Sequence, residues 1–342
     1  MALDELATPD TPPSATPYKP AVQRLLSYNG RVWAGVSSCY TLALYYNRSL
    51  FRNAGLNPDN PPRTISEFDA ASEQLTLQTP TGDIERAGFL HNVPLWWPYF
   101  WPTVFGGSLY DHKNAQATIA SQKGIDAYAW IQGYPNRLGR EATARFATTY
   151  ARAFHQADDP FFTGRAAMVV QGPWIASFIA RQKPDLDYAA TPVPVADLLY
   201  QADAPLGLVE ADVLIIPRGC RHPQEAYDFV RFTQRQDMLE LLASLHGKSS
   251  PLLNVSPSFT AQHTNRYVSV HDAITASPRA DILPQTRVWQ QYSDLTISAF
   301  QAIWDGADVK STLQTTEYRA QSLIDHAVAL RARRALLKGS GA

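Results

Sequence analysis

The sequence predicts an α/β protein, because segments typical of buried strands alternate with segments typical of helices. An apolar run at 166–170 leads through Gly172-Pro173 to a helical stretch that ends near Arg181. A second apolar run at 213–216 ends at Pro217 and precedes a helix that begins near His222. The chain has 342 residues, which is about two domains' worth. We therefore expect α/β architecture with a sizeable core.

The first strands are expected close to the N-terminus. Residues 31–36 and 42–46 are both apolar, and the link between them is too short to hold a helix. Neither run alternates strictly between apolar and polar residues, which is typical of strands that are buried on both faces. We predict that the chain passes here from one buried sheet to another.

The clearest helix start lies at Thr64. Its side chain can cap the first turn, and Glu67, three residues later, can reach back to the capping residue. Ile65, Phe68 and Leu75 then fall on one apolar face.

Two further helical regions follow. The helix from His222 is expected to bury Ala226, Phe229 and Val230, and residues 309–337 are expected to be helical.

Charge and motif content exclude several classes of function. With 30 basic and 31 acidic residues, the chain lacks the net positive charge that would attract the phosphate backbone of a nucleic acid. None of the common nucleotide, zinc-protease or hydrolase motifs occurs, and no two histidines have metal-ligand spacing on a helix. We expect no metal, no cofactor and no catalytic residue. Cys39 and Cys220 could form one bridge, which the sequence does not settle.

The N-terminus carries no basic segment followed by an apolar one, so the chain as written has no secretory signal. Residues 93–110 carry no charge, but three prolines and Gly106-Gly107 interrupt them, and we expect no membrane span.

Aromatic residues are unusually frequent, at 38 in all, and cluster in one segment. Six of the ten residues from Trp96 to Phe105 are aromatic, and prolines make the segment irregular. Trp174 is a further candidate, because it lies where a strand ends and a helix begins. Flat rings on a stiff loop suit the C–H faces of sugar rings, although large aromatics are often simply core.

Five motifs occur in one order along the chain. They are YNGRVWAG at 28–35, LYYNRSLFRNAGL at 44–56, PRTISEF at 62–68, FTGRAAMVVQGPW at 162–174 and IPRGCRHPQEAYDF at 216–229. This series resembles the extracellular solute-binding protein family 1, the sugar-binding components of ABC importers.

The resemblance implies a periplasmic-binding-protein-like fold of type II, with two lobes, a ligand cleft and a hinge. Residues 1–38 and 206–260 would form an incomplete first lobe, and 43–203 with 265–342 the second. The chain would cross between the lobes near 38–42, 204–212 and 258–266. Family members have about a hundred further residues in the first lobe, so this sequence resembles their carboxyl-terminal part.

The resemblance also implies a ligand site. Tyr40 lies at the first crossing and Glu210 at the second, where Glu210 could accept hydrogen bonds from hydroxyls. Trp101-Pro102 resembles a family element that places one of its neighbouring aromatics beside the ligand, and Trp174 matches a stacking tryptophan. The expected ligand-binding residues are therefore Tyr40, Trp97, Tyr99, Trp101, Trp174, Glu210 and Trp289.

The function expected from the resemblance is capture of a mono- or oligosaccharide and its delivery to a membrane permease. The permease subunits would be the protein partners, and we expect a monomer outside the cytoplasm with no nucleic-acid partner. Two alternatives stay open. One is a carbohydrate-active enzyme that uses Glu210 and Asp212 as an acid pair, and the other is a fragment that binds nothing.

Overall fold

The computed structural model describes residues 1–14 and 16–339, and they form two compact units. Unit 1 comprises Met1–Leu77, Arg86–Phe89 and Arg152–Leu283. Unit 2 comprises Gln78–Glu85, Leu90–Ala151 and the described residues from Pro284 onward. The lobe and crossing boundaries given above stay a prediction, and residues 340–342 of the second lobe lie outside the described residues.

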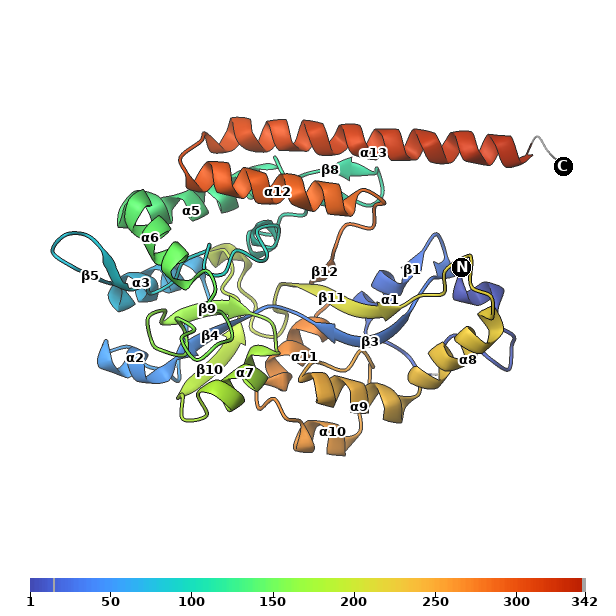
Figure 1. The fold of residues 1–342 in the computed structure, drawn as a ribbon, viewed down its shortest axis with the longest axis horizontal. Helices are drawn as coiled ribbons and strands as arrows, with labels where there is room; N and C mark the ends of the chain where they lie inside the picture. Colours follow the sequence, from blue (N-terminus) through green and yellow to red (C-terminus); the bar gives the residue numbers. More distant parts are fainter. Residues whose placement is uncertain (15, 340–342) are drawn as a thin grey trace. The chain divides into compact units, whose positions relative to one another are not determined.

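Unit 1 contains two three-stranded sheets (Figure 1). One has the order β10-β4-β9, with β4 (Ala43–Asn47) antiparallel to both β9 (Met168–Gln171) and β10 (Tyr188–Pro192). The other has the order β12-β11-β3. In it β11 (Gly207–Leu214) runs parallel to β12 (Ala280–Ile282) and antiparallel to β3 (Gly35–Tyr40). Because β3 and β4 belong to different sheets and only Thr41 and Leu42 join them, the predicted passage between two sheets is confirmed.

Helices cover these sheets within the same unit. The α-helices of unit 1 are α1 (Pro20–Leu26), α2 (Arg48–Asn53), α3 (Ile65–Leu75), α7 (Ile175–Gln182), α8 (Pro223–Thr233), α9 (Gln236–His246), α10 (Pro257–Gln262) and α11 (Val268–Ala276). The unit also contains the short strands β1 (Ser27–Tyr28) and β2 (Arg31–Val32) and the 3-10 helices η1 (Leu3–Glu5) and η2 (Asp197–Leu199). The capping box at α3 is present, with Thr64 and Glu67 each accepting from the other's backbone N–H.

Some local predictions are wrong. Residues 31–36 form two strands rather than one, because β2 ends at Val32 and β3 begins at Gly35. The strand expected at 213–216 begins earlier, at Gly207, and ends at Leu214. Phe229 is 61% exposed, because α8 buries Tyr227 and Val230, three residues apart, and Phe229 falls beside that face.

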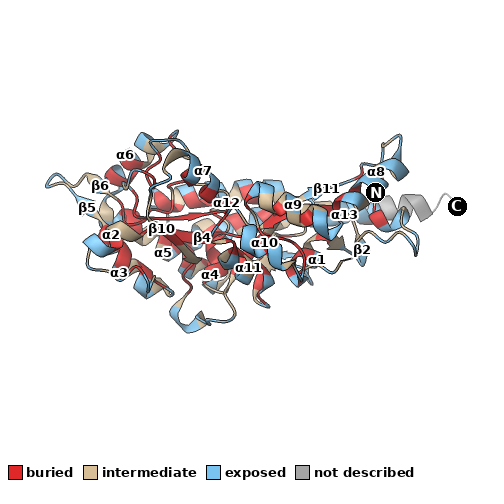
Figure 2. Cartoon of the chain, turned by 90° about the horizontal axis from the view of Figure 1, so that it is seen from below, coloured by how far each residue is buried: buried red, intermediate tan, exposed pale blue. Residues whose placement is uncertain are grey.

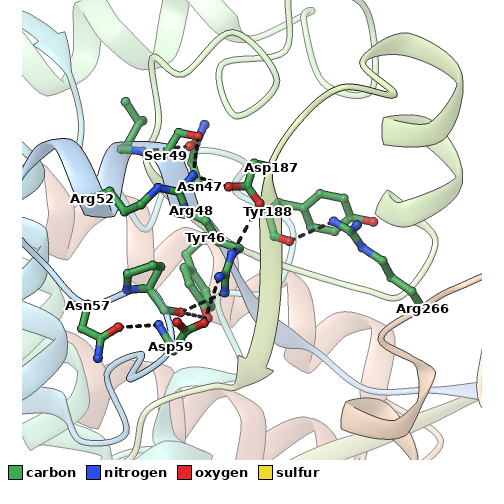
Figure 3. Close-up of polar contacts among 12 residues, drawn as sticks. Tyr46, Asn47, Arg48, Ser49, Arg52, Asn57, Asp59, Asp187, Tyr188 and Arg266 are labelled. Atoms are coloured by element: carbon green, nitrogen blue, oxygen red, sulfur yellow. Dashed lines mark hydrogen bonds and ion pairs between the residues drawn. The ribbon is translucent and has the colours of Figure 1, made fainter.

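A network of charged groups fixes the outer end of β4 and β10 (Figure 3). The Arg48 guanidinium pairs with Asp59 at 2.8 Å and with Asp187 at 3.4 Å. Tyr46 donates to the carbonyl of Pro58 at 2.8 Å, and the guanidinium of Arg266 lies 4.3 Å from the centre of the Tyr188 ring. Arg48, the first residue of α2, thus ties the start of that helix to Asp187, the residue before β10.

Unit 2 is largely helical. It contains α4 (Trp101–Val104), α5 (Gln122–Leu138), α6 (Arg140–Tyr150), α12 (Trp289–Trp304) and α13 (Val309–Gly339), with the short strands β7 (Tyr110–Asp111) and β8 (Gln116–Ala117). Strands β5 (Leu77–Gln78) and β6 (Ile84–Arg86) lie where the chain passes between the units. Helices α12 and α13 lie side by side (Figure 1).

Helix α4 is buried throughout, whereas α5, α6 and α12 each carry both buried and exposed residues (Figure 2). In α5 the buried residues Ala127, Ile131 and Tyr134 recur at spacings of three and four, as one helix face requires. Of the described residues, no helix combines the length and the apolar character needed to cross a membrane.

Candidate functional site

In unit 1, Tyr40 and Trp174 form an aromatic pair. Tyr40 is the last residue of β3, and Trp174 immediately precedes α7, after the turn that follows β9. The ring centroids are 5.2 Å apart and the planes meet at 76°, an edge-to-face arrangement. Both side chains are half-buried, so each keeps part of its ring surface accessible.

The position of the Trp174 indole depends on a glycine. The ring folds back over Gly172 so closely that a Cβ atom there would lie 2.2–2.5 Å from three carbons of the ring. Real Cβ atoms essentially never approach other atoms to within 3.0 Å. Glycine at position 172 therefore leaves the space that this orientation of the indole requires.

Two carboxylates on β11 lie opposite the end of β3. In the sheet register Glu210 faces Tyr40, and Asp212 faces Ser38. The Tyr40 hydroxyl donates to Glu210 Oε2 at 3.1 Å. Burial, together with the neighbouring Glu210 carboxylate, raises the pKa of Tyr40 well above its usual range, so the phenol stays protonated.

Lys248 completes this group, although sequence reasoning did not predict it. Its ammonium pairs with Asp212 Oδ2 and lies 4.8 Å from the centre of the Tyr40 ring and 5.7 Å from that of Trp174. Ser249, the next residue, pairs through its backbone with Cys39 of β3 in an isolated antiparallel β-bridge. This pairing brings Lys248 beside the Tyr40 and Trp174 rings. A single lysine after a helix belongs to no motif that would predict this contact. The contact arises only from the backbone pairing between Ser249 and Cys39.

The charge state of Asp212 follows from these contacts. Burial raises the pKa of its carboxyl, but hydrogen bonds from Lys248 and from Ser38 Oγ, at 2.7 Å, outweigh burial. The pKa of Asp212 therefore lies below its usual value, and the group is ionised at neutral pH. We call Tyr40, Trp174, Glu210, Asp212 and Lys248 the unit 1 cluster.

The aromatic loop lies in unit 2. Tyr99 meets Trp289, the first residue of α12, with ring centroids 5.3 Å apart at 80°. Trp97 is half-buried against Trp96, which is 40% exposed, with centroids 5.4 Å apart. The structure therefore brings Tyr99 and Trp289 together, as the sequence did not show.

Trp101 has a different environment. It is 5% exposed and begins the buried helix α4. Its ring meets those of His91 at 4.7 Å and Trp130 at 5.5 Å, both edge-on. Burial in these apolar surroundings lowers the pKa of His91 well below its usual value, so the imidazole stays neutral. Trp101 thus packs inside unit 2.

The predicted residues fall into two groups, each described within its own unit. Tyr40, Trp174 and Glu210 come together in unit 1, and Tyr99 and Trp289 in unit 2. Among the residues that the structure covers, no group of three or more His, Cys, Asp or Glu could hold a metal ion. Cys39 and Cys220 are both free thiols.

Comparison with known proteins gives the family and the fold. The family model described as "Bacterial extracellular solute-binding protein" matches residues 2–237. A maltotriose-binding protein of Pyrococcus abyssi (strain GE5 / Orsay) is 23% identical over 242 residues, covering 70% of this chain and 48% of that protein. A Brucella abortus (strain 2308) protein named only as a binding protein is 21% identical over 265 residues, covering 77% of this chain and 61% of its own length. The chain thus spans less than two thirds of these curated relatives.

Solved structures of low identity share the fold. CpMnBP1 with mannobiose bound is 23% identical with a TM-score of 0.77, covering 94% of this chain and 78% of that one. The cyclic alpha-maltosyl-1,6-maltose binding protein of Arthrobacter globiformis is 18% identical with a TM-score of 0.71, covering 95% and 80% respectively. The predicted α/β fold of type II periplasmic sugar-binding proteins is confirmed.

Proposed function

Since the chain belongs to the bacterial extracellular solute-binding protein family, we propose that it captures a mono- or oligosaccharide as the binding component of an ABC importer. The ligand would be held by aromatic stacking and by hydrogen bonds to its hydroxyls, with no covalent chemistry. The ligands named for similar proteins, maltotriose and mannobiose among them, support a saccharide as the solute class.

The unit 1 cluster is the observation that carries the proposal. The half-buried Trp174 would offer an indole face to the C–H side of a sugar ring, and Tyr40 packs against the indole edge-to-face. Beside the rings, Glu210 accepts hydrogen bonds and Lys248 donates them. An apolar face next to groups of both hydrogen-bonding kinds matches a sugar, which has C–H faces and a rim of hydroxyls.

A second stacking group is proposed in unit 2. Trp97, Tyr99 and Trp289 are half-buried and so keep part of their rings accessible. Trp101 would support this group from inside the unit, because its burial leaves little ring surface for a direct contact. The contacts proposed in unit 1 are Tyr40, Trp174 and Glu210, and those proposed in unit 2, taken by itself, are Trp97, Tyr99 and Trp289.

The transport role extends the proposal to partners. Delivery to a membrane permease outside the cytoplasm, by a monomer, rests on the family. The lobes proposed from the sequence, with their crossings near 38–42, 204–212 and 258–266, would supply the closing motion around the ligand. Capture of the saccharide is the first step of this role, and an experiment that measures binding alone tests it.

Isothermal titration calorimetry with maltotriose, mannobiose and their monosaccharides tests the proposal. Trp174→Ala should weaken binding by about 2 kcal/mol, roughly thirtyfold, if Trp174 is a central contact. Trp33→Ala is the matched control, because Trp33 is a half-buried tryptophan of the same unit whose Nε1 donates to the carbonyl of Tyr28. Unchanged affinity in Trp174→Ala would remove Trp174 from the site, and flat titrations across the panel would contradict saccharide binding.

The enzyme alternative makes a different prediction. Glu210 and Asp212 would have to act as acid and base, but the Lys248 ion pair keeps Asp212 ionised and unsuited to donate a proton near neutral pH. Turnover of a glycoside panel that is abolished by Glu210→Gln would favour the enzyme. If the wild-type protein turns over no glycoside and Glu210→Gln weakens sugar binding, the result would favour the binding protein.

A further inference from the structure

A pocket lies in unit 1 along the segment that connects β10 to β11. Its empty space, which includes open solvent at the mouth, is about 490 Å³. Its walls are the end of β10, some of the residues between 193 and 206 in the connection, and the two arginines at 63 and 279. It shares no lining residue with the unit 1 cluster, and the proposed saccharide site does not use it.

The charges that line the pocket have one sign. Arg63 and Arg279 are its charged lining residues, and no carboxylate is among them; Asp197 and Asp203 of the same connection do not line it. Within the described ranges 1–14 and 16–339, neither guanidinium takes part in an ion pair at 4.0 Å or less. Arg279 Nη1 donates to the carbonyl of Ala204 at 3.0 Å, which leaves its other N–H groups to point elsewhere.

The remaining lining is mostly apolar. Val193 and Val195 are buried in the wall, and Pro192, Leu199 and Leu206 extend it. Tyr200 and Gln201 add polar side chains that make no hydrogen bond with another described residue. The pocket thus combines two cationic donors with an apolar body, which suits a ligand having the opposite arrangement.

We propose that this pocket binds a small organic carboxylate with an apolar body. Arg63 and Arg279 would hold the carboxylate, because a guanidinium offers paired N–H donors that match the two oxygens. The apolar walls would cover the body of the ligand. A neutral sugar has neither feature, so this site and the proposed saccharide site select different molecules.

Calorimetric titration with sodium benzoate tests the proposal, with benzyl alcohol as the neutral analogue and inorganic phosphate as the anion without an apolar body. Benzoate should bind at one site and at least about tenfold more tightly than either comparison compound, since charge-assisted hydrogen bonds and apolar contact both contribute. Arg63→Gln and Arg279→Gln should each weaken benzoate binding by about tenfold. Arg218→Gln, at an exposed arginine outside the pocket, should leave it unchanged.

Four results would overturn the proposal. They are no saturable benzoate binding at millimolar concentration, equal binding of benzyl alcohol, equal binding of phosphate, and undiminished binding in Arg63→Gln. The last variant is informative even if Arg279→Gln fails to fold through loss of its contact with Ala204, because the Arg63 side chain is exposed. Equal binding of phosphate would refute the role of the apolar walls. Trp174→Ala should leave benzoate affinity unchanged, which separates this test from that of the saccharide site.

Discussion

Gly172→Ala should weaken ligand binding by displacing the Trp174 indole, although Gly172 is not itself a proposed ligand contact. The new methyl group would lie 2.2 Å from the nearest carbon of the Trp174 ring, whereas ordinary contact begins at 3.4 Å. The indole must therefore move by about 1 Å or rotate away, since the backbone of Gly172 is buried and held between β9 and α7.

The size of the effect follows from what the movement disrupts. An indole displaced by about 1 Å keeps some contact with a ligand but loses the alignment with Tyr40 and with the sugar face. We expect a loss of about 1–2 kcal/mol, or roughly 5- to 30-fold in Kd, somewhat below the effect of deleting the ring.

The assay is calorimetric titration with the saccharide that the wild-type protein binds best. Gly219→Ala is the matched control, because a Cβ atom at Gly219 has nothing within 4 Å and should leave the affinity unchanged. Thermal unfolding of all variants should be compared in parallel, so that a global loss of structure is recognised. Tryptophan fluorescence should change in Gly172→Ala and not in Gly219→Ala.

A double-mutant cycle decides whether the indole carries the effect. In the Trp174→Ala background the methyl group of Gly172→Ala has no ring to meet, so adding it should cost almost nothing. If Gly172→Ala weakens binding equally in both backgrounds, or does not weaken it in the wild type, the argument that Gly172 positions Trp174 is refuted.

Three further predictions concern stability. Trp101→Ala should destabilise the protein by about 3–5 kcal/mol, because the ring is enclosed by other aromatic rings; a loss below about 1 kcal/mol in urea unfolding would contradict its core role. Thr64→Ala should cost about 1 kcal/mol by removing the cap of α3, whereas Thr81→Ala, at an exposed turn, serves as the control in the same unfolding assay. Burial lowers the pKa of His271 to about 3, so it stays neutral in the folded protein while the unfolded chain takes up a proton below about pH 6.5; stability should fall by roughly 2 kcal/mol between pH 6.5 and 4.5 on this account. His271→Gln should show a weaker pH dependence by that amount, and an identical dependence in both proteins would count against it.

Local signals in the sequence determined much of the secondary structure. Thr64 and Glu67 specified the start of α3, because a capping box involves only residues within one turn. The passage from β3 to β4 could be predicted from two apolar runs with a link too short for a helix. The face of α8 could not, since Phe229 and Tyr227 are both apolar enough for a core and only the neighbouring elements decide which is buried.

The candidate site shows the same division. The sequence predicted Tyr40, Trp174 and Glu210 through family resemblance, but it could not predict the contact of Lys248, which lies in a loop with no motif. The strand register between β3 and β11 and the bridge from Cys39 to Ser249 bring that lysine to the rings. Likewise, Trp97 and Trp101 lie four residues apart, and only packing places one ring half-exposed and the other in the core.

The sequence by itself determined the α/β class and the capped start of α3, and it singled out the aromatic residues proposed to contact a sugar, because these depend on local pattern and side-chain chemistry. The tertiary structure alone decided which rings keep an accessible face, which charges pair, and where two arginines meet a pocket without a carboxylate. Those features arise between residues far apart in the chain, whose proximity is set by sheet register and packing and leaves no mark in either segment alone.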